Sequence, residues 1–437
     1  MAGRRRAWRG EKRFGDQEVQ TITTLLISHP ACLAHDMGEG HPEQPERLRA
    51  IERALESEVF QMLARDVAPR ADLAAIARVH PLDYIEALRA ATPTQGRTDI
   101  DQDTSMSPGS FEAALRSAGG AIFAVDEVMT RKARNAFVAT RPPGHHAEAT
   151  MPRGFCFFNN AAIAARHAQA AYGAERVAIV DFDVHHGNGT QHIFWDEKNV
   201  MYASTHEMPL FPGTGAIGER GEHDQIVNAP LRAGDTGEVF REAMEVAILP
   251  RVVDFAPDLV IVSAGFDAHH RDPLGNLNFV EADFAWITRR LMEIAQKCCA
   301  GRMVSVLEGG YDLRALGRSV AAHVTALMEG SDARDQEHSW SRRIARVGVG
   351  SPPRRRKESM SASEEMVRER AYELWDRAGR PHGRSDEFWF AAKADFERRG
   401  RTGEGQLHVL VRRRVEPCRH ETATDWGKRA HASRFWD

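Results

Sequence analysis

Cysteines are scarce in this chain, and no long apolar run occurs in it. Five of the 437 residues are cysteine, an odd number without paired spacing, which argues against a disulfide-stabilised secreted domain and favours a reducing compartment. No stretch is long and apolar enough for a transmembrane helix, and the basic start Met1–Arg6 lacks the apolar segment of a signal peptide. We therefore expect a soluble, cytoplasmic protein with no membrane partner.

Acidic and basic residues are unevenly distributed, although the whole chain carries a net charge of only −4. Residues 341–437 contain 23 Lys and Arg against 15 Asp and Glu, so the acidic excess lies in the preceding residues. The basic run Arg354–Lys357 is short and follows a Gly- and Pro-containing stretch, which favours a solvated linker over a nucleic-acid-binding arm. We expect no nucleic-acid partner, unless the basic tail binds DNA.

Polar clusters that follow strand-like runs are the most informative feature of the sequence. The apolar run Val177–Val180 is typical of a buried strand, and the polar segment Asp181–Thr190 follows it directly. Because side chains alternate faces along an extended segment, Asp183 and His185 are expected to point to the same side. A carboxylate and an imidazole on one side form half of a site for a divalent metal ion.

Three further polar clusters follow apolar runs in the same way. Asp267 comes after Leu259–Val262 and is the natural third metal ligand. Tyr311 comes after another such run and two glycines, and its hydroxyl is a candidate hydrogen-bond donor. The adjacent His145 and His146 come after a fourth run and supply an acid/base pair. Ligands of open α/β sheets bind outside the carboxyl ends of the strands, so the four clusters are expected to meet there.

Each cluster has an alternative interpretation when it is taken alone. An aspartate at a strand end is more often a helix cap or a turn residue. A tyrosine after two glycines is usually a packed aromatic, and a histidine pair is more often structural than catalytic. Four chemically complementary clusters at successive strand ends are hard to explain by packing alone, and together they favour an enzyme.

The order of the motifs resembles that of the histone deacetylase superfamily, in particular its class II-like bacterial branch. The motifs are Arg-Pro-Pro-Gly-His-His, Gly-Phe-Cys-Phe-Phe-Asn-Asn, Asp-Phe-Asp-Val-His-His-Gly-Asn-Gly-Thr, Phe-Pro-Gly-Thr-Gly, Ser-Ala-Gly-Phe-Asp-Ala-His and Glu-Gly-Gly-Tyr-Asp. The similarity covers residues 21–330 and includes His41–Leu48, which resembles the family's N-terminal signature. It implies the arginase/deacetylase fold, an α/β fold with an open, mostly parallel sheet of about eight strands and helices on both faces.

The resemblance also implies a zinc-dependent amidohydrolase that removes acetyl or other acyl groups from the ε-amine of lysine. Its metal ligands would be Asp183, His185 and Asp267, which suit Fe²⁺ as well as Zn²⁺. His146 would act as the general base on the attacking water. The other residues with implied catalytic roles are His145, Asp181 behind it, Tyr311 as the oxyanion donor, and Asn188, which stands where some family members carry a second carboxylate.

Substrate-binding residues follow from the same resemblance. Phe155 and Phe211 would face each other across the aliphatic stem of the substrate, and Leu274 at the rim lacks the charge found in polyamine-preferring relatives. The full set of substrate-binding candidates is Gly154, Phe155, Phe211, Leu274, Gly310 and Asp103. An inner site for a monovalent cation, K⁺, would be formed by Asp181, Asp183, His185, Ser204 and Thr205.

Two other functions remain open at this stage. An acetylpolyamine or another small acylated amine could be the substrate of the same site, and a non-catalytic acyl-lysine reader is a third interpretation. An arginase-like site with two manganese ions is disfavoured, because Asn188 and Ala268 stand where further carboxylates would be needed. The sequence does not decide between a monomer and a homo-oligomer.

Domain boundaries follow from composition and periodicity. With 42% hydrophobic residues, the chain can bury a large core. Near the C-terminus, Val367, Ala371, Leu374 and Trp375 form a helical stripe. The expected parts are a basic N-terminal extension (1–20), a catalytic domain (21–330), a linker (331–362), a small α-helical module (363–400) and a disordered tail (401–437).

Overall fold

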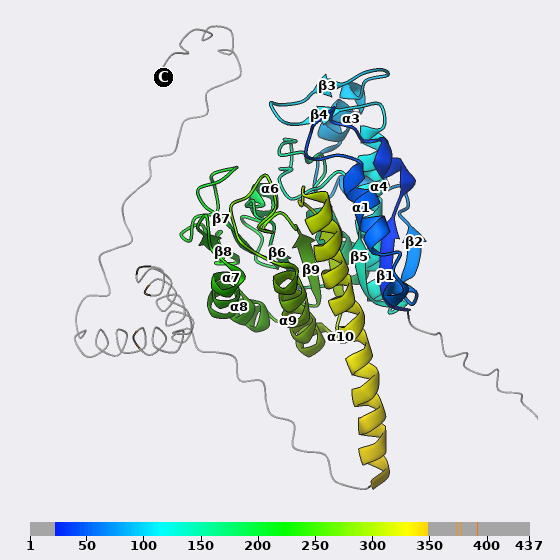
Figure 1. Cartoon of the computed structure of the whole chain (residues 1–437), viewed down its shortest axis with the longest axis vertical. Coiled ribbons are helices and arrows are strands. Elements are labelled where there is room, and N and C mark those ends of the chain that lie inside the picture. Colours follow the sequence, from blue (N-terminus) through cyan, green and yellow to red (C-terminus); the bar gives the residue numbers. More distant parts are fainter. Residues whose placement is uncertain (1–21, 348–373, 375–376, 378–390, 392–437) are drawn as a thin grey trace, which may run out of the picture. The chain divides into compact units, whose positions relative to one another are not determined.

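Eight parallel strands form the centre of the protein. The computed structural model describes residues 22–347 and the isolated positions 374, 377 and 391. Within them the sheet has the order β2-β1-β5-β10-β9-β6-β7-β8 (Figure 1), which confirms the predicted fold class. The strands are β1 (Ile22–Ser28), β2 (Ala64–Val67), β5 (Ala133–Val138), β6 (Val177–Asp181), β7 (Val200–Glu207), β8 (Ile226–Leu231), β9 (Leu259–Ala264) and β10 (Met303–Leu307). A small antiparallel pair, β3 (Thr98–Asp99) and β4 (Ser105–Met106), lies outside this sheet.

Helices cover both faces of the sheet. The α-helices are α1 (Glu46–Ala54), α2 (Leu73–Ile76), α3 (Leu82–Ala91), α4 (Ser110–Met129), α5 (Asn160–Tyr172), α6 (Asn188–Ile193), α7 (Gly237–Ala243), α8 (Leu249–Phe255), α9 (Glu281–Cys299) and α10 (Leu313–Val347). Short 3₁₀ turns span Pro30–Ala34 and Glu58–Phe60, and a π-helical turn spans Met244–Ile248. On β5, Phe137 packs against His323 of α10, whereas its neighbour Val138 lies beneath Gly120 of α4. Consecutive strand residues therefore contact helices on opposite faces.

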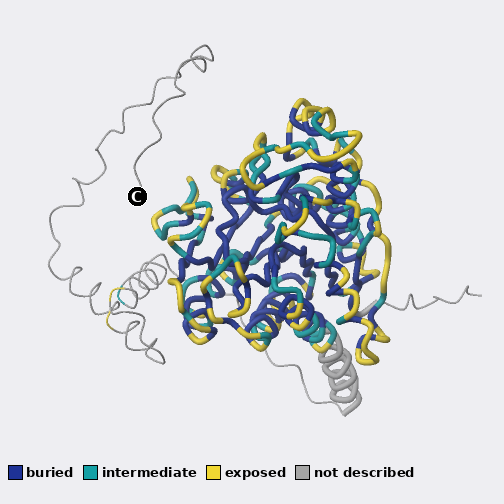
Figure 2. The backbone as a smooth tube through the Cα atoms, turned by 45° about the horizontal axis from the view of Figure 1, so that its top comes forward, coloured by how far each residue is buried: buried dark blue, intermediate teal, exposed yellow. Residues whose placement is uncertain are grey.

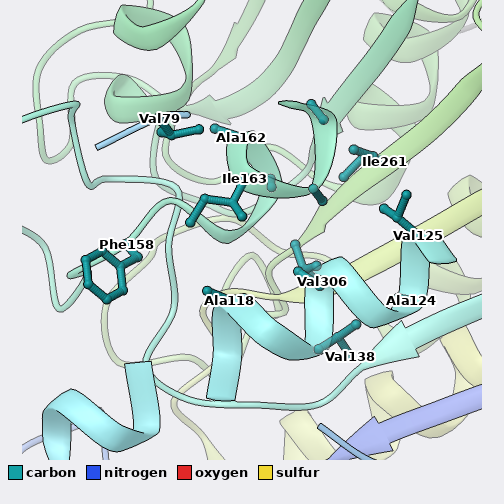
Figure 3. Close-up of a cluster of buried hydrophobic side chains, with 14 of the residues drawn as sticks. Val79, Ala118, Ala124, Val125, Val138, Phe158, Ala162, Ile163, Ile261 and Val306 are labelled. Carbon is teal, nitrogen blue, oxygen red and sulfur yellow. The ribbon is translucent and has the colours of Figure 1, made fainter. Parts of the chain in front are cut away.

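The core lies between the sheet and the helix pair α4 and α5. Val138, Val306 and Ile261 come from three neighbouring strands and meet Ala118 and Ile163 of these helices (Figure 3). The central strands β6, β9 and β10 are buried along their whole length (Figure 2), so they carry mostly apolar runs rather than an alternating pattern. The edge strand β2 is largely exposed. Small residues on α4 allow close approach, because a Cβ atom on Gly120 would lie 2.9 Å from a methyl carbon of Val138.

The four polar clusters predicted from the sequence follow four adjacent strands. They leave the carboxyl ends of β5, β10, β9 and β6, which are neighbours in that order in the sheet. Because the strands are parallel, all four clusters emerge at the same edge. Crossover connections thus bring together segments that are far apart in the sequence.

The domain boundaries stay predictions for most of the remaining chain. Residue 331, where the linker was predicted to begin, lies inside α10, which continues to Val347. The N-terminal extension, and the helical module and tail except for positions 374, 377 and 391, lie outside the described residues. Within the described part of the chain, no helix combines the length and apolar character needed to cross a bilayer.

Candidate metal and catalytic site

Three side chains suited to metal binding meet where β6 and β9 end. Asp183 and His185 follow β6, and Asp267 follows β9. One donor atom from each residue lies within 4.8 Å of the others. Nδ1 of His185 is 3.1 Å from Oδ1 of Asp183 and 3.2 Å from Oδ2 of Asp267. The three predicted metal ligands are thus brought together with their donor atoms facing a common point.

Backbone amides fix the two carboxylates of this group. Asp183 accepts hydrogen bonds from the N–H of His185 at 2.9 Å and of Gly309 at 2.7 Å. Asp267 accepts one from the N–H of Val184 at 2.8 Å. At Gly309 a Cβ atom would lie 1.9 Å from Oδ2 of Asp267, so only glycine fits there without displacing the carboxylate. These bonds hold both oxygens of Asp183 and one oxygen of Asp267 in place.

The donor set fits a divalent cation. Burial together with the neighbouring Asp183 raises the pKa of Asp267 to about 7. Burial opposes the charged form of His185, but Asp183 and Asp267 outweigh it and raise its pKa to about 10. Two adjacent buried carboxylates need a positive charge between them, and two carboxylates with one imidazole suit Zn²⁺ and Fe²⁺.

His145 is held by the carboxylate of Asp181, the last residue of β6. Its Nδ1 lies 3.0 Å from Oδ2 of Asp181, which also accepts a hydrogen bond from the hydroxyl of Tyr202 at 3.0 Å. Burial disfavours a charged imidazole, but Asp183 and Asp181 outweigh it and raise the pKa of His145 to about 10. The geometry therefore favours the imidazolium form of His145.

His146 lies in the opposite electrostatic environment. Burial and the neighbouring His145 and His185 lower the pKa of His146 well below its usual value, which favours the neutral ring. Its Nδ1 lies 2.9 Å from Oδ1 of Asn188, and the ring centroid is 4.0 Å from that of His145. Gly154 backs onto this ring with a φ of +56°, and a Cβ atom there would lie 2.5 Å from Cδ2 of His146. A neutral base and a cationic neighbour thus lie side by side.

Tyr311 completes the group from the end of β10. Its side chain is buried, and burial raises the pKa of its hydroxyl well above the usual value, so the phenol stays a donor. The guanidinium of Arg47 lies 4.8 Å from the centre of the ring and donates to the carbonyl of Gly310 at 2.7 Å. The N–H of Tyr311 donates to Asp272 at 2.6 Å. These contacts fix both the ring and the turn that carries it.

The predicted substrate-binding residues lie in two places around the catalytic histidines and Tyr311. Asp103 and Phe211 line a cavity of about 510 Å³, together with Ile100, Asp101, Gln102, Met151, Pro152 and Arg153. The ring of Phe211 is 38% exposed and lies 5.0 Å from that of His146. The ring of Phe155 instead packs 5.8 Å from Tyr311, on a residue with a φ of +68°. Leu274 is half-buried, and its N–H donates to Asp272.

Two of the residues predicted to bind a monovalent cation, Asp183 and His185, are also predicted metal ligands, and two others, Asp181 and Ser204, lie on the adjacent strands β6 and β7. Ser204 on β7 is paired in register with Asp181 on β6, and both are fully buried. Oδ1 of Asp181 accepts the N–H of Asp183 at 3.1 Å. The hydroxyl of Ser204 bonds with Nδ1 of His206 at 2.9 Å. Binding of K⁺ by these residues stays a prediction.

Sequence reasoning gave no role to Glu308, the last residue before the two glycines. Its buried carboxylate accepts the N–H of Gly144 at 2.7 Å and of His145 at 3.1 Å, and the hydroxyl of Ser263 at 3.0 Å. Burial is the main reason that its pKa is raised to about 7. An acidic residue directly after a buried, mostly apolar strand was the available signal.

A second group that the sequence did not indicate is centred on the buried Glu43. Arg141 donates to both carboxylate oxygens of Glu43, and Arg47 donates to one of them. Arg141 begins the turn that carries the histidine pair, while Arg47 also donates to the carbonyls of Glu308 and Gly310. Glu43 therefore connects the histidine turn to the tyrosine turn through two arginines.

Comparison with known proteins assigns the family. Residues 41–327 match the family model of the histone deacetylase domain. A probable deacetylase of Archaeoglobus fulgidus is 37% identical over 317 residues, which cover 71% of this chain and 88% of the relative. The histone deacetylase-like amidohydrolase of Pseudomonas aeruginosa is 39% identical over 277 residues, with coverage of 62% and 73%. The crystal structure of the HDA15 HD domain matches with a TM-score of 0.67 and 36% identity, covering 71% of this chain and 90% of that one.

A separate match covers part of the C-terminal region. Residues 362–398 match a family described as a protein of unknown function (DUF2934). These are nearly the residues of the predicted helical module. The larger match, the relatives and the parallel eight-stranded sheet together confirm the resemblance seen in the sequence. The chain belongs to the histone deacetylase family and is a hydrolase of the deacetylase type.

Proposed function

We propose that this protein hydrolyses the amide between an acyl group and the ε-amine of lysine, with His146 as the general base. The observation that carries the proposal is the pair of adjacent histidines with opposite protonation preferences beside three converging metal donors. General base catalysis requires a neutral acceptor within reach of the attacking water, and His146 meets that requirement.

Asp183, His185 and Asp267 would hold the divalent cation, Zn²⁺ or Fe²⁺. When bound, such an ion supplies Lewis-acid chemistry, because it polarises an amide carbonyl and lowers the pKa of a water molecule. The role of the protein is to place the base, the positive charge and the oxyanion donor around the reacting amide.

Each of the remaining groups has one task in this scheme. His146 takes the proton of the attacking water at Nε2 and later delivers a proton to the leaving amine. His145, kept positive by Asp181, stabilises the negative charge that develops on the acyl carbon's oxygen. Tyr311 donates its hydroxyl proton in a hydrogen bond to the same oxygen. Asn188 orients the ring of His146.

Acyl-lysine is the substrate class that the surrounding side chains favour. Phe211 and Phe155 offer apolar rings next to His146 and Tyr311, where an extended aliphatic stem would lie. Leu274 offers no charge for a second amine. The backbone of Gly154 packs directly against the ring of His146, and Asp103 lies at the outer cavity. Gly310 has close contacts with Leu316 and Phe266, which leave no room for a side chain.

The test compares turnover of an acetyl-lysine peptide with that of acetylated putrescine and spermidine. Purified protein is assayed as isolated, after chelation and after zinc restoration, alongside Tyr311→Phe. Tyr172→Phe serves as the matched control, because the hydroxyl of Tyr172 bonds with Asp126 and takes no part in the site. Peptide turnover that requires both zinc and the Tyr311 hydroxyl is the expected result.

Two other results would change the proposal. Preference for the acetylated polyamines would replace acyl-lysine with a small acylated amine as the substrate class. Absence of turnover on all three substrates by the zinc-restored protein would overturn the catalytic assignment and favour an acyl-lysine reader.

A further inference from the structure

Asn188 forms a bridge between His146 and an acidic side chain. Oδ1 of Asn188 lies 2.9 Å from Nδ1 of His146, and its Nδ2 donates to Oε1 of Glu148 at 2.9 Å. Asn188 is buried, whereas the side chain of Glu148 is 22% exposed. The amide is thus held at one end by a carboxylate and at the other by the imidazole.

The hydrogen-bonding capacity of these groups fixes the direction of the amide. A side-chain amide alone can turn by half a rotation, which exchanges its oxygen and its NH₂ group. A carboxylate only accepts hydrogen bonds, so the NH₂ group of Asn188 must face Glu148. The amide oxygen must then face His146, and Nδ1 of His146 must carry the hydrogen atom. Nε2 is left with the lone pair that a general base needs.

We propose that Glu148 is a positioning residue that selects the tautomer of His146 by fixing the direction of the Asn188 amide. This inference rests on the proposed function only in naming His146 as the base. The tautomer itself is a property of the resting protein, and it can be measured without turnover.

The comparison with His145 shows what the bridge accomplishes. At His145 the carboxylate of Asp181 contacts the ring nitrogen directly, at 3.0 Å. At His146 the carboxylate of Glu148 is one amide further away, so the hydrogen is placed on the same nitrogen without an anion against the ring. An adjacent anion would favour the imidazolium form. The bridge therefore selects the tautomer while it keeps the ring neutral.

Glu148 is itself tied to the wall of the outer cavity. Its N–H donates to the carbonyl of Met151 at 3.0 Å, and the guanidinium of Arg153 lies 3.5 Å from its carboxylate. The same guanidinium lies 5.5 Å from the ring centre of Phe211, which faces the ring of His146. Two residues that line the cavity therefore contact Glu148: Met151 through its backbone carbonyl and Arg153 through its guanidinium.

The experiment measures the tautomer of His146 by ¹⁵N NMR in zinc-loaded protein with ¹⁵N-labelled histidine. The signal is assigned by its loss in His146→Gln. In the unaltered protein, Nδ1 should be protonated and Nε2 unprotonated. In Glu148→Lys the side chain can only donate, so the amide should reverse and the hydrogen should move to Nε2. Turnover should fall by about 10- to 100-fold through kcat, with KM nearly unchanged.

A double variant that exchanges the carboxylate and the amide tests whether the tautomer of His146 can be rescued. Glu148→Gln alone loosens the preference, because a glutamine amide can either donate or accept. Glu148→Gln combined with Asn188→Asp restores a carboxylate facing Nδ1, and it should restore the Nδ1–H tautomer. Because this carboxylate also favours the imidazolium form, turnover should recover mainly at higher pH. Glu197→Gln is the matched control, since Glu197 forms an ion pair with Arg166 and is 27% exposed.

Two results would overturn the inference. One is an unchanged Nδ1–H tautomer in both Glu148→Lys and Glu148→Gln. The other is a kcat loss in these variants that the double variant fails to rescue even at higher pH, since that would indicate a purely structural role. A protein that lacks turnover but shows the expected tautomer changes would refute the proposed function while it supports this inference.

Discussion

Acidification should destabilise the protein through His323, a buried histidine of α10. Nδ1 of His323 lies 2.6 Å from the hydroxyl of Thr288, and Nε2 lies 3.1 Å from that of Ser305. Thr288 also lies 2.6 Å from the carbonyl of Phe284, to which it donates. The Thr288 oxygen therefore accepts from Nδ1–H, and Ser305 donates to Nε2, so a neutral ring satisfies both contacts.

Burial lowers the pKa of His323 to about 3 in the folded protein, against 6.5 for an exposed histidine. The folded state therefore prefers the neutral ring, and the unfolded chain binds the proton more readily below pH 6.5. The stability that depends on the neutral ring is fully present above pH 6.5 and is lost progressively as the pH falls towards 3. At pH 4.5 the loss is about 3 kcal/mol, from two pH units at roughly 1.4 kcal/mol each.

Urea unfolding at pH 7.5 and pH 4.5, with chelator throughout, measures this loss against His323→Gln. Glutamine can bond with both hydroxyls and does not titrate, so all other titrating groups cancel in the comparison. The wild-type protein should lose about 3 kcal/mol more than the variant between the two pH values. A difference below roughly 0.5 kcal/mol would refute the assignment of His323 as a buried neutral group.

Two substitutions behind the metal ligands should have distinct effects. Gly309→Ala places a Cβ atom against Asp267 and should weaken zinc binding at least about tenfold in a competition titration. Gly218→Ala is the control and should leave zinc affinity unchanged, because a Cβ atom there would meet nothing within 4 Å. Equal zinc affinities in the two variants would contradict the steric argument. Glu308→Ala should destabilise the fold by about 2 kcal/mol in urea unfolding, because it leaves two buried N–H groups unpaired. Glu308→Gln keeps an acceptor for these groups and should lose less stability. Equal losses of stability in the two variants would show that the charge of Glu308 matters more than its hydrogen bonds.

Local pattern was sufficient to predict the four strands β5, β6, β9 and β10 and the polar segments that follow them. Apolar runs such as Val177–Val180 were long enough to identify a buried strand. Asp183 and His185 do lie together, but in a bend after the strand rather than in the extended segment that the alternation argument assumed. The family resemblance supplied the remaining expectations for the site. The distances at His146 and Asn188 suit their predicted contact, although their catalytic roles stay predictions.

The order of the strands could not be read from the sequence. The clusters after β5 and β6 are consecutive in the chain, but β10 and β9 lie between those strands in the sheet. This order is set by crossover packing rather than by local propensity. For the same reason, the contacts of Glu43 with Arg141 and of Glu308 with Gly144 were not predicted, since each joins residues that only the folded chain brings together.

The buried bridge through Glu43 limits how the protein can be trimmed or rearranged. A version that begins after Arg47 would leave Arg141 as a buried charge without its carboxylate and would remove the donor to the carbonyl of Gly310. The first helix and the segment before it therefore form part of the support of the catalytic turns. A circular permutant or a two-fragment version would have to supply residues 43–47 for the site to assemble.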